Sequence, residues 1–131
     1  MNRLLVSVVC MAGLTWLTLL AASLIRVKGW TQRGMRLAFG NRDNLPDATA
    51  FAGRAERTAR NTLENFVLFA ALALVAQAAG ATSERVIFGA QLFLWARLFY
   101  VPVYLAGIAF LRTVVWGVSL VGLGIMLQGM F

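Results

Sequence analysis

The sequence predicts an all-α membrane protein, a bundle of four transmembrane helices that forms one domain over residues 1–131. Of these 131 residues, 60% are hydrophobic and only 13% are charged, whereas a soluble domain is typically about half apolar and a quarter charged. The charges are also confined, because residues 4–25, 65–83 and 113–131 contain none. Each of these runs is close to the roughly 20 residues that cross a hydrocarbon core about 30 Å thick.

The four spans are expected near residues 4–25, 54–79, 85–106 and 112–130. The first follows a basic start and is reminiscent of a signal peptide, but its apolar run exceeds the usual h-region of about 7–15 residues. We therefore expect it to remain as a membrane helix. The third span has a single charge, Arg97. Gly, Asn and Pro between the first two spans predict a loop at 26–53.

The distribution of charge predicts the orientation. Residues 26–60 contain eight basic and three acidic residues, which leaves +5 there, while the connection before the third span has only Glu84 and Arg85. The positive-inside rule then makes the first loop cytoplasmic and both termini non-cytoplasmic. A total charge of +7 in a soluble protein would suggest nucleic acid, but the spans leave no room for a basic domain. The basic loop residues are assigned to topology and to attraction of anionic lipid headgroups; they are Arg26, Lys28, Arg33, Arg36 and Arg42.

The absence of histidine and the presence of one cysteine exclude a disulfide framework and any standard zinc cluster, so no metal site is expected. That cysteine, Cys10, lies in the apolar first span and is interpreted as a small hydrophobic residue. Small residues that would permit close approach of helices in lipid occur on the second and fourth spans. They are Ala70, Ala73, Ala76, Gly117, Gly122 and Gly124, with Gln77 beside them.

Polar side chains gather on one side of the second predicted helix. At 100° per residue, its polar positions fall within an arc of about 120°. These positions are Arg54, Arg57, Arg60, Asn61 and Glu64. On the third helix, Arg97, Tyr100 and Tyr104 follow at intervals of three and four residues and share a face. The sequence therefore predicts a polar stripe on each of two neighbouring helices.

Both stripes are expected at one membrane level, together with Arg112, because the second helix leaves the cytoplasmic side and the third returns to it. Ionisable residues at such depth face the bundle interior or water and indicate a function. We expect Glu64 to pair with Arg97, in competition with Arg57 and Arg60. A buried ion pair that only fixes helix register is the alternative. The surplus of arginines instead predicts a small anionic guest, with Glu64 free to receive an ammonium group.

Two segments resemble the MAPEG family, the membrane-associated proteins in eicosanoid and glutathione metabolism. RAERTARNTLENF, residues 54–66, is similar to the family's second helix, in which arginines precede an Asn and, three residues later, a Glu. WARLFYVPVYLAGIAFLRT, residues 95–113, is similar to the family's third helix, with its Arg and later Tyr, and to the Arg that opens the fourth. The resemblance runs over most of the chain and implies a homotrimer of four-helix subunits.

The resemblance also implies that glutathione is held at each subunit boundary near the cytoplasmic face. Its ligands would come from the second and third helices. They are Arg57, Arg60, Asn61, Glu64, Arg97, Tyr100 and Tyr104. As catalytic residues, Arg112 would lie beside the glutathione sulfur, and Thr113 occupies a position where a hydroxyl residue occurs in prostaglandin-synthesising members.

The activity implied is that of a glutathione-dependent membrane enzyme, which transfers the glutathione thiolate to a lipophilic electrophile or reduces lipid hydroperoxides. Glutathione carries two carboxylates and one ammonium group, which suits clustered arginines with Glu64. A thiol of ordinary pKa near 8.5 ionises more readily beside an arginine, and the thiolate is the nucleophile. Two alternatives remain: a non-catalytic scaffold that binds glutathione or lipid, and a small proton-coupled exporter that uses Glu64.

Overall fold

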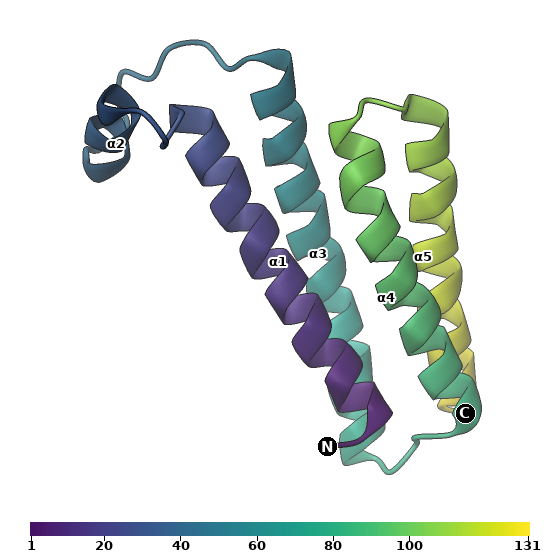
Figure 1. The fold of residues 1–131 in the computed structure, drawn as a ribbon. Helices are drawn as coiled ribbons and strands as arrows, with labels where there is room; N and C mark the ends of the chain where they lie inside the picture. The colour runs from purple at the N-terminus through teal and green to yellow at the C-terminus, as the bar shows by residue number, and fades with distance from the viewer.

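A computed structural model describes all 131 residues as helices and short connections. Four helices are long and apolar enough to cross a membrane: α1 (Arg3–Val27), α3 (Ala50–Ala78), α4 (Glu84–Leu105) and α5 (Ala109–Gly129). They alternate in direction, so that both termini lie at one end of the bundle, beside the α3–α4 connection (Figure 1). The opposite end carries the α1–α3 connection and the turn between α4 and α5. The predicted all-α bundle of four spans is confirmed.

A side-chain cap starts each helix except α5. The side chains of Asn2, Thr31, Thr49 and Ser83 each accept a hydrogen bond from a backbone N–H three residues ahead. The cap at Thr49 starts α3 four residues before the predicted boundary at residue 54. The α4–α5 turn contains a left-handed glycine, Gly107, with φ of 79°, and α5 then begins three residues before the predicted boundary at 112.

The loop expected at 26–53 joins α1 to α3, but part of it is helical. This segment contains a fifth helix, α2 (Gln32–Phe39), which Thr31 caps. Glycines at 29, 34 and 40 suggested turns, but Gly34 lies inside α2. An eight-residue helix also spans little more than two turns, which is too short for its periodicity to stand out from the sequence.

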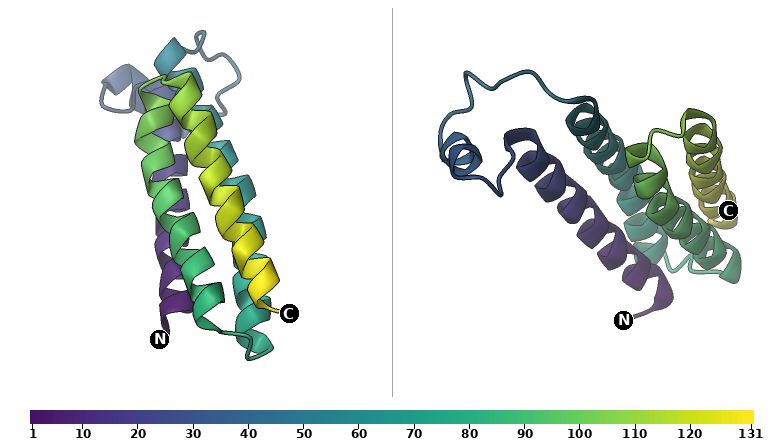
Figure 2. Two further views of the ribbon diagram at one scale, coloured as in Figure 1. Left: turned by 90° about the vertical axis from the view of Figure 1, so that its right-hand side faces the viewer. Right: turned by 45° about the horizontal axis from the view of Figure 1, so that its top comes forward.

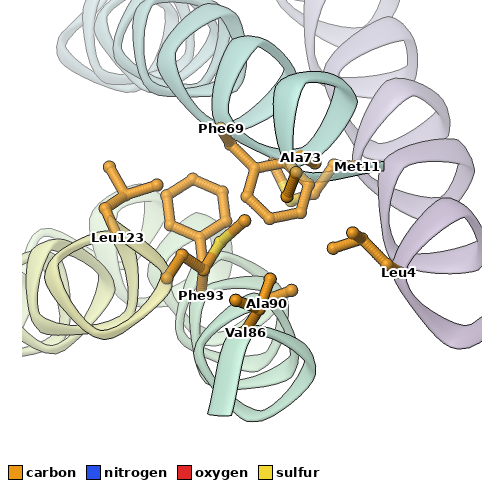
Figure 3. Packing of buried hydrophobic residues seen from close by; sticks show 10 residues of the cluster. Leu4, Met11, Phe69, Ala73, Val86, Ala90, Phe93 and Leu123 are labelled. Atoms are coloured by element: carbon orange, nitrogen blue, oxygen red, sulfur yellow. The ribbon is translucent and has the colours of Figure 1, made fainter. Parts of the chain in front are cut away.

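The apolar core lies in the half of the bundle nearest the termini. α1 packs mainly on α3 and α5 mainly on α4, and the two pairs lie side by side (Figures 1 and 2). Where they meet, the rings of Phe69 and Phe93 are stacked with centroids 4.6 Å apart (Figure 3). Leu4, Met11 and Leu123 surround these rings. Only a small cluster of buried alanines on α1 and α3 lies toward the other end, which leaves that end for polar groups.

Two glycines bring α4 and α5 into direct backbone contact. A Cβ atom added to Gly122 would lie 2.8 Å from both the carbonyl oxygen of Gly89 and the backbone nitrogen of Phe93. Gly122 therefore serves packing within the subunit, and so do Ala73 and Ala76, which are fully buried in the core. Because they are buried within the chain, these three residues are taken up by its own packing and do not support a contact with a second copy.

Replacing Gly122 by alanine is expected to destabilise the bundle, because the added methyl group meets backbone atoms that cannot move aside. Overpacking of this kind typically costs about 1–3 kcal/mol. Gly124→Ala is the matched control, since nothing lies within 4 Å of a Cβ atom at Gly124. Unfolding midpoints in detergent should fall for the first variant only. Equal midpoints for both variants would contradict the close α4–α5 contact.

Candidate functional site

A cavity of about 510 Å³ opens between α3, α4 and α5 at the end of the bundle away from the termini. Polar and aromatic side chains from all three helices line it. They are Arg57, Arg60, Asn61, Glu64, Tyr100, Tyr104, Arg112, Thr113 and Trp116. Eight of the nine site residues predicted from the sequence therefore lie around one cavity. The start of α3, the end of α4 and the start of α5 meet at one level, as the alternation of the spans predicts.

The charged groups of the cavity have no protein counter-ion. The two salt bridges of the chain join Arg3 to Glu84 and Arg26 to Glu56, both outside the cavity. Three arginines against Glu64 leave the lining with a net charge of +2. Because the lining arginines have no protein counter-ion, their charge remains available to bind an anion through the planar guanidinium groups.

The predicted Glu64–Arg97 ion pair is absent, and that prediction is wrong. Arg97 is fully buried, with 0% exposure, and it lies behind the cavity wall without lining it. Its Nη2 donates to Asn61 Oδ1 at 2.9 Å and to Thr62 Oγ1 at 3.1 Å. The guanidinium also lies 4.1 Å from the centroid of the Tyr100 ring, a cation–π contact. Its Nε and Nη1 have no hydrogen-bond partner.

Arg97 fixes the orientation of Asn61. The carboxamide oxygen Oδ1 of Asn61 accepts from Arg97 and, at 3.4 Å, from Nδ2 of Asn65. Because Oδ1 is engaged on the protein side, the NH₂ group of Asn61 is the half of the amide left to donate to a guest. Sequence reasoning missed Thr62 and Asn65 as supports of this arrangement. Asn65 follows Asn61 by four residues, a spacing that places both on one helix face.

Tyr104 connects the three helices at the cavity. Its hydroxyl oxygen accepts a hydrogen bond from Arg57 Nε at 3.2 Å, and its ring lies beneath the guanidinium of Arg112, 4.7 Å away. The rings of Tyr100 and Tyr104 meet edge to face with centroids 5.5 Å apart. These contacts hold one arginine from α3 and one from α5 against the same aromatic side chain.

Thr113 and Arg112 differ in the hydrogen-bond donors that each has left for a guest in the cavity. The Thr113 hydroxyl donates to the carbonyl oxygen of Ala109 at 3.2 Å, one turn earlier in α5. In this conformation its hydrogen is already used, and its oxygen is left as an acceptor. Arg112 retains its guanidinium donors. Of the two predicted catalytic residues, Arg112 is the better placed to stabilise an anion in the cavity.

Two further residues complete the description of this end. Arg54, part of the predicted stripe on α3, lines an adjoining pocket of about 200 Å³, and its Nε donates to the carbonyl oxygen of Leu105 at 3.0 Å. It thereby ties the start of α3 to the end of α4. Trp116 lines the main cavity and was not predicted. It follows Arg112 by four residues, so the helical period could have identified it as an apolar wall.

Comparison with known protein families shows which family the chain belongs to. A sequence profile of the MAPEG family matches residues 4–130, nearly the whole length. No curated protein and no solved structure matches the chain significantly. The four apolar helices agree with an integral multi-pass membrane protein. By its sequence over essentially its full length, the protein is a member of the MAPEG family.

Proposed function

We propose that the protein is a glutathione-dependent membrane enzyme, which transfers the glutathione thiolate to a lipophilic electrophile or reduces lipid hydroperoxides. The observation that carries the proposal is the cavity in which three arginines and Glu64 gather without ion pairs among themselves. The assignment to the MAPEG family, which includes glutathione transferases, peroxidases and eicosanoid synthases, supports it.

The charge of the cavity matches ionised glutathione. The tripeptide has two carboxylates, one ammonium group and, when deprotonated, one thiolate, so its net charge is −2 against +2 for the lining. Arg57 and Arg60 are the proposed carboxylate partners, and Glu64 the partner of the ammonium group. Asn61 offers an amide N–H donor, while Tyr100 and Tyr104 provide aromatic walls. Arg97 contributes through Asn61, since it does not line the cavity.

The proposed chemistry uses the sulfur of glutathione. Arg112 stabilises the thiolate, which attacks the electrophile; a carbon–sulfur bond forms, and the leaving group departs with its electron pair. With a hydroperoxide, the thiolate attacks oxygen and the O–O bond breaks. The alkoxide takes a proton, and the sulfenic acid of glutathione reacts with a second glutathione to give the disulfide and water. Trp116 gives the cavity an apolar side for a lipophilic substrate.

We further propose a homotrimer with the site at each subunit boundary and with the α1–α3 connection on the cytoplasmic side. Arg57, Arg60 and Glu64 are exposed in the single chain, so a neighbouring subunit has room to close the cavity on this flank. The surplus of basic residues around α2 supports the orientation through the positive-inside rule.

Purified protein in detergent tests the proposed activity. We expect it to bind glutathione and to conjugate a hydrophobic electrophile such as chlorodinitrobenzene, or to reduce a fatty-acid hydroperoxide with loss of glutathione thiol. Binding without turnover on either substrate would favour the glutathione-binding scaffold. Absence of glutathione binding would contradict the proposal itself.

Replacing Arg97 by methionine is expected to weaken glutathione binding without lowering the stability of the protein. Methionine fills similar volume and removes a buried cation that lacks a carboxylate partner, so the unfolding midpoint should stay or rise. Asn61 loses the bond that orients it, so glutathione affinity should fall several-fold, in line with about 1 kcal/mol for one hydrogen bond.

Calorimetric titration of Arg97→Met, Asn61→Ala and the double variant measures this coupling. If Arg97 acts through Asn61, the two losses of affinity overlap and the double variant binds about as weakly as Asn61→Ala. Fully additive losses would instead indicate that Arg97 contributes independently of Asn61.

A further inference from the structure

The outer face of α2 carries large apolar side chains that nothing in the chain covers. Trp30, just before the helix, is 71% exposed and Phe39, at its end, is 86% exposed. Met35 precedes Phe39 by four residues, so both lie on one helix face, and it is exposed as well. We refer to Trp30, Met35 and Phe39 as the α2 apolar face.

The packing of α2 fixes which way this face points. A Cβ atom on Gly34 would lie 2.0 Å from the carbonyl oxygen of Lys28 and 2.4 Å from that of Val27, so α2 abuts the end of α1 through its glycine. Met35 and Phe39 are roughly 100° and 140° from Gly34 around the helix. The contact with α1 therefore turns the α2 apolar face outward.

The position of α2 places this face at the level where α1 ends. Only four residues separate α2 from the end of α1, a helix long and apolar enough to cross the bilayer. In two views, α2 lies on the side of α1 away from α4 and α5, beyond the outline of the four spans (Figures 1 and 2). The contact of Gly34 with the last carbonyl groups of α1 keeps it at that level.

The charge beside the α2 apolar face is positive and unpaired. Residues 28–42 include no acidic residue, and neither salt bridge of the chain involves them. Their four basic side chains are Lys28, Arg33, Arg36 and Arg42. Of these, Arg36 flanks the face, and an arginine in this position can lay its stem along the apolar surface and keep its head at a lipid phosphate.

We propose that α2 is an interfacial helix that docks on the surface of a bilayer containing anionic phospholipids. Trp30, Met35 and Phe39 enter the boundary between headgroups and acyl chains, while Arg36, which lies about 60° from Phe39 around the helix, binds a lipid phosphate. Burial of the apolar side chains supplies one part of the free energy of binding to the bilayer, and attraction between basic side chains and anionic lipids supplies the other. Attraction to anionic lipid adds about 1 kcal/mol for each basic residue near the surface and weakens with salt.

The test uses the full chain with Trp30 as its only tryptophan, the other three replaced by phenylalanine, reconstituted into vesicles. Phosphatidylcholine brominated on its upper acyl carbons reports contact with lipid, in vesicles with or without phosphatidylglycerol. We expect blue-shifted Trp30 emission that bromine quenches, more strongly with phosphatidylglycerol and less so at high salt. Met35→Ser with Phe39→Ser should remove most of the quenching.

Replacing Arg36 by glutamine should weaken the dependence on phosphatidylglycerol while leaving quenching in pure phosphatidylcholine. Arg85→Gln, at the start of α4 and at the other end of the bundle, is the matched control and should change neither. The proposal is overturned if aqueous acrylamide quenches Trp30 freely and bromine does not. It is also overturned if Trp30 is shielded from both quenchers in vesicles and in detergent alike, which would assign the face to a second copy of the chain.

Discussion

Arg112→Ala is expected to slow glutathione conjugation by roughly 100- to 1,000-fold, the loss typical of removing one preorganised donor from a developing or reacting anion. Arg112 lines the cavity, has no acidic partner and is held over the ring of Tyr104. Glutathione binding should be nearly unchanged, because Arg57 and Arg60 are the proposed carboxylate partners. The measurement is kcat and the dissociation constant for glutathione, with the thiolate followed by its ultraviolet absorbance.

Thr113→Ala is the comparison for this prediction. The Thr113 hydroxyl already donates to Ala109, so its loss should reduce kcat by roughly 10-fold or less, the scale of one neutral hydrogen bond. The opposite pattern would be a normal rate for Arg112→Ala and a large loss of rate for Thr113→Ala. It would show that the Thr113 hydroxyl group, and not Arg112, stabilises the thiolate.

Glu64→Gln is expected to weaken glutathione binding by roughly 10- to 100-fold, because a hydrogen bond to a charged group contributes about 1.5–3 kcal/mol. Glutamine keeps the size of the side chain and removes only its charge. Glu64 lines the cavity and forms no ion pair within the chain, so the proposed ammonium contact is the one that the substitution removes. Calorimetric titration of glutathione into the purified variants measures the change.

N-acetylglutathione sharpens this prediction, because it lacks the ammonium group. The wild type should discriminate against it, and Glu64→Gln should bind both ligands about equally. Glu84→Gln is the matched control, since Glu84 lies at the start of α4 outside the cavity and pairs with Arg3. Retained discrimination in Glu64→Gln would show that another group receives the ammonium.

The long spans and the polar end of the bundle were predictable, because apolar length and helical period are local properties of the sequence. The arc on α3 and the spacing on α4 placed six predicted residues at the cavity without knowledge of how the helices pack. Alternation of the spans was enough to bring them to one level. The same period applied to α5 would have added Trp116.

Pairings across helices were less predictable, because they depend on rotations of each helix that periodicity leaves open. The sequence placed Arg97 and Glu64 on facing stripes, but Arg97 turns toward Asn61 and Thr62. The role of Gly122 was likewise hidden, since a small residue permits close approach to any neighbour. Only the contact with Gly89 assigns it to the α4–α5 pair. The short helix α2 needed its tertiary contact at Gly34 to be recognised.

Binding of glutathione and of its dimethyl ester to the purified protein tests the central proposal most directly. The ester keeps the thiol and the ammonium group and loses both carboxylates. By calorimetry we expect glutathione to bind and the ester to bind at least roughly 100-fold more weakly, as the loss of two charge-assisted contacts implies. Arg57→Ala should narrow the difference in affinity between glutathione and its dimethyl ester. Equal binding of the two ligands, or no binding of glutathione, would contradict the assignment of the arginine cavity as a glutathione site.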